Sequence, residues 1–208
     1  MYYLVQRGEP LIITRLARWM GVRPSTVTQV VRLLEHKGAL QRNMQGNVSL
    51  TSTGMQQAIA SVRRHRIIER FLFDVVRVPW HLAHQEAVGI EQAVSARLEE
   101  RIIALVGPAR CSPYGHPIDP DPATDRRTGQ ALLHVPLGAQ FVVRRIDEEA
   151  EEQADLLHAL FTAQLLPEQQ VVIAATPPHC RVKLPNTLQV NTVTLAMAKA
   201  VWGDVLMP

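Results

Sequence analysis

Apolar residues are spaced in two different ways along this chain of 208 residues. They recur every three to four positions over residues 13–20, 24–37 and 56–106, which predicts amphipathic helices with a break near Val78-Pro79-Trp80. Over residues 131–208 they gather in short runs, such as Phe141-Val142-Val143 and Val171-Val172-Ile173, which predict the strands of a small all-β unit. Residues 107–130 contain five prolines and three glycines, so we expect a linker there.

The first two helical patterns meet at a tight turn. Gly21 favours the left-handed conformation that ends a helix, and Pro24 suits the first turn of the next one. Beyond Gly38, two short alternating stretches, residues 39–41 and 48–50, flank the polar residues 42–47 and predict a hairpin. Two short helices and a hairpin predict a winged helix-turn-helix, although an ordinary three-helix packing unit with solvated polar residues is the alternative.

Small polar and basic residues gather at the start of the second helix. Ser and Thr hydroxyls bind phosphates or base edges, Gln makes paired hydrogen bonds to adenine, and Arg binds guanine or phosphate. With one residue from the hairpin, the residues that we expect to contact DNA are Arg23, Pro24, Ser25, Thr26, Thr28, Gln29, Arg32 and Arg42.

Charge is distributed unevenly along the chain. Residues 1–118 carry 15 Lys and Arg against 8 Asp and Glu, a charge of +7, whereas residues 119–208 carry 7 against 11, a charge of −4. A basic N-terminal half fits a polyanionic partner such as nucleic acid. Charges also segregate by chance, so this asymmetry only adds to the argument from the helices.

Several classes of protein are excluded by what the sequence lacks. No run approaches the roughly 18 apolar residues of a membrane span, and the N-terminus has no basic-then-apolar export signal. Cys111 and Cys180 have no CxxC partner, which excludes a cysteine zinc site and suits a reducing compartment, so we expect a cytoplasmic protein. Without HExxH, a nucleophile elbow or a phosphate-binding glycine loop, we expect no catalytic residues and no enzyme.

The middle of the chain predicts three helices, at residues 63–76, 82–94 and 97–106. Their apolar faces fit a homodimer, which would match a two-fold DNA operator, and a closed monomeric bundle explains the pattern nearly as well. His65 and Glu69 share one helix face, as do His84 and Glu91. Such side chains can bind a divalent transition metal through nitrogen and oxygen, whereas a surface ion pair is the more common reason for this spacing.

Three stretches, in this order, resemble one known family. RHRIIERFLFDVV, HLAHQEAVGIEQAVSARLEERI and SPYGHPI are similar to the diphtheria toxin repressor and manganese transport regulator family of metal-dependent repressors. The front of the chain resembles the winged helix of that family, and VPLGAQFVVRRI resembles its C-terminal SH3-like domain. The resemblance implies a homodimer that binds Mn²⁺ or Fe²⁺, with Zn²⁺, Co²⁺ or Ni²⁺ as other suitable ions, and then a double-stranded DNA operator.

The same resemblance places His65, Glu69 and His84 in one of the two metal sites of the family. That site is often completed from the SH3-like domain, where Glu151, Glu152 and Asp155 are candidates.

The second metal site of the family is altered in this chain. Glu91 falls on one of its ligand positions, but Val88 stands where the family has a Cys, Met or acidic ligand, and Gln92 stands where it has His. The first helix of the family, which supplies further ligands, begins about a turn or more before Met1. We therefore expect one intact site and one weakened site, with Gln92 a weak ligand through its amide oxygen.

Together these patterns predict a fold that is mainly α with a small β part. The expected parts are a winged helix-turn-helix domain at residues 1–55, a helical dimerisation and metal-binding domain at 56–118, a linker at 119–130 and an SH3-like β-barrel at 131–208. The expected function is that of a metal-dependent, Mn- or Fe-type transcriptional regulator that represses metal-homeostasis genes. The alternative is a metal-independent DNA-binding regulator of the same fold, which Val88 and Gln92 favour.

Overall fold

The computed structural model describes residues 2–6, 10–44, 47–121, 129–176, 180–185 and 187–206. Residues 45–46 of the predicted hairpin and Pro122 of the predicted linker lie outside these ranges. The chain forms two compact units: the first comprises residues up to Arg63 and a short stretch from Asp119, and the second comprises Arg64–Ile118 and the C-terminal part. No helix in the described ranges is long and apolar enough to cross a membrane.

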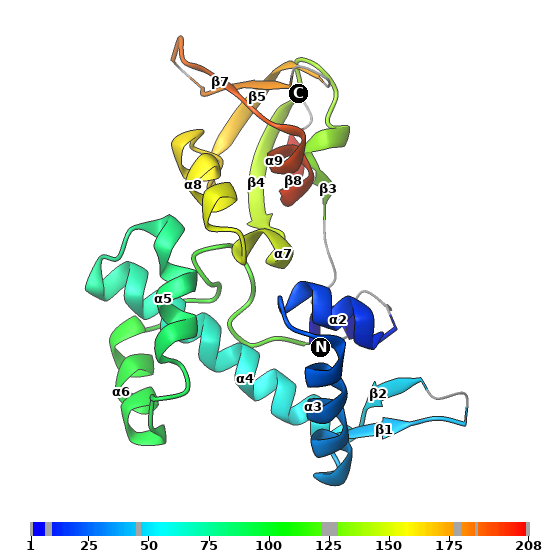
Figure 1. Ribbon diagram of the computed structural model, residues 1–208. Helices are drawn as coiled ribbons and strands as arrows, with labels where there is room; N and C mark the ends of the chain where they lie inside the picture. The colour runs from blue at the N-terminus through cyan, green and yellow to red at the C-terminus, as the bar shows by residue number, and fades with distance from the viewer. Residues whose placement is uncertain are drawn as a thin grey trace. The chain divides into compact units, whose positions relative to one another are not determined.

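The first unit contains the helices α1 (Tyr2–Gln6), α2 (Ile13–Trp19) and α3 (Pro24–His36), followed by the antiparallel strands β1 (Leu40–Arg42) and β2 (Val48–Leu50) (Figure 1). Both predicted helices and the hairpin are therefore confirmed. Gly21 has a φ of +62°, so the turn between α2 and α3 uses the left-handed conformation that glycine adopts without strain.

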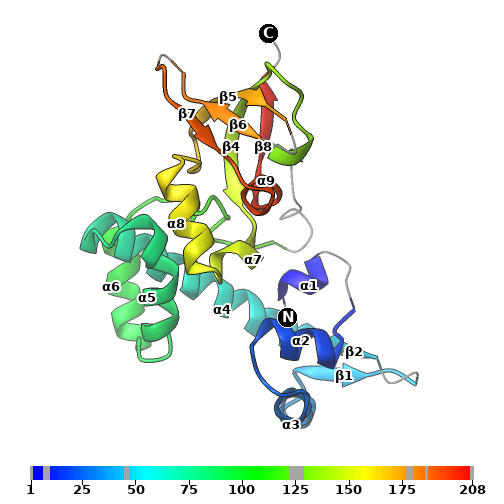
Figure 2. The ribbon, with the colours of Figure 1, turned by 45° about the horizontal axis from the view of Figure 1, so that its top comes forward.

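The core of the first unit joins α2 and α3 to the hairpin. Leu16 on α2, Val31 on α3 and Leu40 on β1 are all buried in one apolar cluster. Arg42 Nε lies 3.0 Å from Glu35 Oε1, an ion pair between β1 and α3, and Figure 2 shows the hairpin beside that helix. Arg42 was predicted in the polar tip of the hairpin, but it lies in β1, because the strand extends one residue further.

The long helix α4 (Ser52–Phe71) begins after the hairpin and runs into the second unit, where it continues as a π-helical turn at Leu72–Val76. A short 3-10 turn at Trp80–Leu82 leads into α5 (Ala83–Ile90), and α6 (Ala96–Val106) follows. The predicted break near residue 79 is confirmed. The predicted helix 82–94 is too long, because α5 ends at Ile90.

The C-terminal part of the second unit is built on a six-stranded antiparallel sheet in the order β3-β8-β4-β5-β6-β7 (Figure 1). All neighbouring pairs are antiparallel. The strands are β3 (Gln130–Ala131), β4 (Gln140–Ile146), β5 (Gln170–Ala175), β6 (Arg181–Lys183), β7 (Val190–Thr192) and β8 (Val201–Leu206).

Among the described residues, three α-helices accompany this sheet, α7 (Glu148–Glu151), α8 (Ala154–Thr162) and α9 (Leu195–Ala200), together with a 3-10 turn at Leu132–His134. The prediction of an all-β unit was therefore wrong, and the region mixes helices with a sheet. Leu157 and Leu160 of α8 are buried in the same apolar cluster as Phe141 and Val171 of the sheet. Their three-residue spacing is helical, and the short apolar runs on either side obscured it.

Candidate metal centre and nucleic-acid interface

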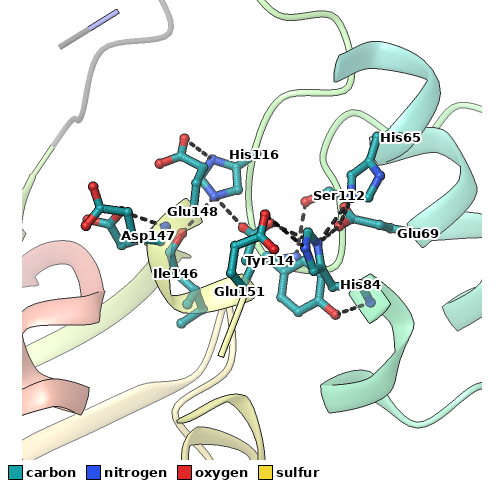
Figure 3. Close-up of polar contacts among 12 residues, drawn as sticks. His65, Glu69, His84, Ser112, Tyr114, His116, Ile146, Asp147, Glu148 and Glu151 are labelled. Carbon is teal, nitrogen blue, oxygen red and sulfur yellow. Dashed lines mark hydrogen bonds and ion pairs between the residues drawn. The ribbon is translucent and has the colours of Figure 1, made fainter. Parts of the chain in front are cut away.

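Three side chains from two helices of the second unit converge on one point. His65 and Glu69 lie one turn apart on α4, and His84 lies near the start of α5 (Figure 3). Glu69 Oε1 is 2.9 Å from His65 Nε2 and 2.8 Å from His84 Nδ1, and these two nitrogens are 3.1 Å apart. The three side chains offer one ligand atom each within a span of 4.8 Å, so the geometry suits a metal ion.

The other nitrogen of His65 has a different partner. His65 Nδ1 lies 2.8 Å from Glu91 Oε2, and the amide Nε2 of Gln92 donates to Glu91 Oε1 over 3.3 Å. Glu91 and Gln92 follow directly after α5. The structure thus brings Glu91 to the cluster of His65, whereas Val88 is half exposed.

Hydrogen bonds of two buried aromatic residues fix the start of α5. The Tyr114 hydroxyl accepts a hydrogen bond from the backbone N–H of His84 over 2.9 Å and donates one to the Trp80 carbonyl over 2.8 Å. The Trp80 indole N–H in turn donates to the Pro113 carbonyl over 2.9 Å. These buried bonds hold the backbone of His84 in place, so its imidazole is presented from a rigid position.

Of the three candidates from the C-terminal part, two approach the cluster. Glu151 Oε2 lies 3.6 Å from His84 Nδ1, and Glu152 Oε1 lies 3.7 Å from His84 Nε2. Glu151 is buried at the end of α7, a short helix whose start is capped by the Asp147 side chain. Asp155 is exposed on α8 and takes part in none of these contacts.

A buried histidine that the sequence analysis did not single out lies next to this cluster. His116 Nε2 is 2.9 Å from Glu151 Oε1 and 2.7 Å from the carbonyl oxygen of Ile146, and His116 Nδ1 is 3.3 Å from Glu148 Oε1 (Figure 3). Burial lowers the pKa of His116, but Glu148 and Glu151 outweigh it and raise the pKa overall. Glu151 therefore lies between His116 and His84 and links the two clusters.

Neighbouring charges determine which groups hold protons. Burial lowers the pKa of His65, but Glu69 and Glu91 raise it overall to about 10. Burial likewise lowers the pKa of His84, and Glu152, Glu69 and Glu151 raise it overall to about 9. Burial raises the pKa of the Glu69 carboxyl, whereas the two imidazoles hold it well below its usual range. The metal-free cluster therefore keeps protons on its imidazoles at neutral pH.

In the first unit, α3 presents most of the predicted DNA contacts to solvent. Thr28 is half-buried, and its hydroxyl donates to the Pro24 carbonyl over 2.9 Å. Arg42 forms the ion pair with Glu35 described above. The remaining predicted residues are exposed on α3 or directly before it: Arg23, Pro24, Ser25, Thr26, Gln29 and Arg32.

Known proteins are similar to this chain in sequence and in fold. Residues 51–120 match the family model described as iron dependent repressor, metal binding and dimerisation domain. The iron-dependent repressor IdeR of Mycobacterium tuberculosis is 31% identical over 187 residues, which cover 85% of this chain and 81% of IdeR. The chain belongs to this family of metal-dependent transcriptional repressors. The diphtheria toxin repressor of Corynebacterium glutamicum is 28% identical over 162 residues, 75% of this chain and 71% of that protein.

Solved structures of such repressors agree. A manganese-dependent transcriptional repressor in complex with manganese has a TM-score of 0.79 and 27% identity, and the match covers 95% of this chain and 92% of that one. The predicted family is confirmed, and with it the predicted class of function, that of a transcriptional repressor of the iron- and manganese-dependent type. Because the family consists of transcriptional repressors, the chain is not an enzyme, as the sequence predicted.

Sequence reasoning missed two buried residues that adjoin the cluster, His116 and Glu148. His116 stands inside SPYGHPI, a stretch used only for the resemblance, and Glu148 stands in the acidic run 147–152. A histidine within a family signature and a carboxylate three residues before Glu151 are signals that could have drawn attention to both. Their contact with each other depends on the long-range packing of residues 112–117 against the end of β4, which no local pattern reveals.

Proposed function

We propose that this repressor is activated by a divalent transition-metal ion, Mn²⁺ or Fe²⁺, held by His65, Glu69 and His84. The observation that carries the proposal is the convergence of three ligand atoms from α4 and α5 within 4.8 Å. Two imidazole nitrogens and one carboxylate oxygen suit Mn²⁺, Fe²⁺, Co²⁺, Ni²⁺ and Zn²⁺. The relatives are named iron-dependent and manganese-dependent repressors, which favours the first two ions.

The charged groups around the three ligands also suit a cation. The side chain of Glu69 is 1% exposed and carries a negative charge that a cation would neutralise. Glu151 Oε2 lies 3.6 Å from His84 Nδ1, the nitrogen that faces Glu69, near enough to complete a coordination shell by a small side-chain movement. Glu152 Oε1 lies 3.7 Å from His84 Nε2, on the other edge of the ring. We therefore include Glu151 among the proposed ligands and leave out Glu152 and Asp155.

For the first unit we propose a winged helix-turn-helix, with α3 in the major groove of the operator and the β1–β2 hairpin as the wing. The exposed polar and basic face of α3 and the hairpin beside it support this assignment. We assign residues 1–55 to this domain and residues 131–208, with their antiparallel sheet, to the SH3-like domain of the family. Residues 56–118 become the dimerisation and metal-binding domain, which the match over 51–120 supports.

The proposed switch uses the connection between the ligands and the DNA-binding domain. α4 begins at Ser52, directly after the hairpin, and carries His65 and Glu69, while His84 belongs to α5. When both helices hold the same ion, they are joined, and in a homodimer this favours one spacing of the two α3 helices. Binding energy that differs between the two arrangements shifts the population toward the form that binds DNA.

DNA binding in the presence and absence of metal tests the proposal. A labelled duplex is first selected from a random-sequence pool with the full chain in Mn²⁺, and its affinity is then measured in Mn²⁺ and in chelator. We expect tight binding only with the ion, and we expect His65→Ala with His84→Ala to remove the difference. Equal affinity under both conditions would refute metal activation and leave DNA binding in place.

A metal-independent regulator is the second candidate, and Val88 and Gln92 favour it because neither can replace the usual ligands. The metal-free cluster is also satisfied by its own ion pairs, with Glu69 bonded to both imidazoles. On this alternative, the doubly substituted variant retains full operator affinity.

A further inference from the structure

We propose that Glu91 is a positioning residue for the single metal centre and not a ligand of a second one. In this role it holds His65 in the tautomer and orientation that bind metal, and Gln92 holds Glu91 in turn. The inference rests on the proposed metal site at His65, Glu69 and His84. It gives a role to Glu91 and Gln92, which belong to a site where the side chain of Val88 offers no ligand atom.

The two nitrogens of His65 face different surroundings. Nε2 lies 2.9 Å from Glu69 Oε1 and 3.1 Å from His84 Nδ1, so it belongs to the group of ligand atoms. Nδ1 lies 2.8 Å from Glu91 Oε2. Because the two nitrogens are on different edges of the ring, a carboxylate bonded to Nδ1 faces away from an ion bound at Nε2.

This arrangement fixes the proton of His65. An imidazole binds metal through a nitrogen that carries no proton, so a His65 that binds through Nε2 must hold its remaining proton on Nδ1. The carboxylate of Glu91 accepts a hydrogen bond from that N–H and so favours this tautomer. A carboxylate behind a metal-bound histidine commonly raises its affinity for the ion by fixing the ring and making it more basic.

Both oxygens of Glu91 are engaged in this arrangement. Oε2 faces His65, and Oε1 accepts from the amide of Gln92 over 3.3 Å. Val88 is half exposed and offers no ligand atom. Gln92, Glu91 and His65 thus form a chain of hydrogen bonds that ends at the proposed ion, so two residues from the altered second site support the first.

Zn²⁺ binding to the full chain tests this role, because Zn²⁺ suits the same ligands and permits NMR of the bound imidazoles. We expect one Zn²⁺ per chain in the parent protein and in Glu91→Ala, with affinity about 10- to 100-fold lower in the variant. Glu91→Gln should recover part of the loss, since its amide oxygen still accepts from Nδ1–H. In ¹⁵N-histidine spectra, His65 should be the Nδ1–H tautomer in the Zn²⁺-loaded parent protein.

Glu86→Ala is the matched control, because Glu86 is an exposed carboxylate on the same helix, α5. It should bind Zn²⁺ as the parent protein does, and Gln92→Ala should lose less affinity than Glu91→Ala. The inference is overturned if Glu91→Ala binds normally, if it loses one of two ions, or if Glu91→Gln is as weak as Glu91→Ala. Failure of the metal site itself looks different: the parent protein and His84→Ala would then bind Zn²⁺ equally.

Discussion

Replacing Glu69 by Gln isolates the charge on which the cluster depends. The side chain is 1% exposed, and one of its oxygens lies within 2.9 Å of both His65 and His84. Gln has nearly the same shape, so Glu69→Gln removes the negative charge and a ligand and leaves the packing almost unchanged. The metal-free protein should then lose stability for an electrostatic reason.

The magnitude follows from the two hydrogen bonds. A bond to a charged partner contributes about 1.5–3 kcal/mol and a neutral one about 0.5–1.5 kcal/mol, so the change costs about 2–3 kcal/mol at pH 7. Glu69 and its neighbours raise the folded pKa of His65 to about 10 and that of His84 to about 9. Stabilisation by a raised histidine pKa is complete below the ordinary value of 6.5 and is lost as the pH rises through the folded value. The cost should therefore shrink toward zero between pH 7 and pH 10.5.

Urea unfolding in chelator at both pH values measures this cost, with Glu86→Gln as the exposed control on α5. Mn²⁺ titration of the same variant should show affinity reduced by about 100-fold or more, since Glu69→Gln loses a charged ligand and outer-shell changes alone cost 10- to 100-fold. An equal loss of stability at pH 7 and pH 10.5 would mean that Glu69 acts through shape, and the electrostatic reasoning would then be wrong.

Three further predictions concern the protons of the metal-free cluster, two glycines and the exposed face of α3. Mn²⁺ binding at pH 7 should release about one to two protons per ion, because His65 and His84 must give up a proton to bind it, and fewer toward pH 10. Calorimetry in two buffers of different ionisation enthalpy measures this release. No release would contradict the raised pKa values of His65 and His84. Gly54→Ala should destabilise the protein by about 1–3 kcal/mol, because a Cβ there would lie 1.8 Å from the Ala39 carbonyl oxygen. A Cβ at Gly89 on α5 would meet nothing within 4 Å, so Gly89→Ala should stabilise the protein by about 0.5–1 kcal/mol. Thermal unfolding measures both changes. Arg32→Ala should weaken operator binding by about 1–3 kcal/mol in fluorescence anisotropy with no change in unfolding, and an unchanged affinity would remove α3 from the interface.

Local patterns predicted α2, α3 and the hairpin, because residues close in the sequence set where these elements begin and end, but they did not predict α1. Gly21 and Pro24 mark the turn between α2 and α3, and the alternation around residues 39–50 produces the hairpin. In the middle, Arg77 adopts a left-handed conformation with a φ of +67°, which ends the π-helical turn. Only a proline two residues later indicated that break, so its position was predicted and its form was not.

Tertiary packing decided what the sequence missed. α8 is amphipathic, but its apolar residues adjoin others that face the same core, so its periodicity was hidden. The cluster around His65 was expected from helix spacing and from family resemblance. The sequence grouped Glu91 with these side chains on neighbouring helices, but its direct contact with His65 Nδ1 depends on how the end of α5 packs beside α4, which residue spacing does not reveal.

Reciprocal coupling between metal and DNA tests the central claim most directly. The affinity for the selected duplex is measured with and without Mn²⁺, and the affinity for Mn²⁺ is measured with and without saturating duplex. If the ion at His65, Glu69 and His84 activates DNA binding, both affinities should rise by the same factor, about 5- to 150-fold, and His84→Ala should reduce that factor to one. Mn²⁺ that binds with the same affinity whether or not the duplex is present would contradict the account.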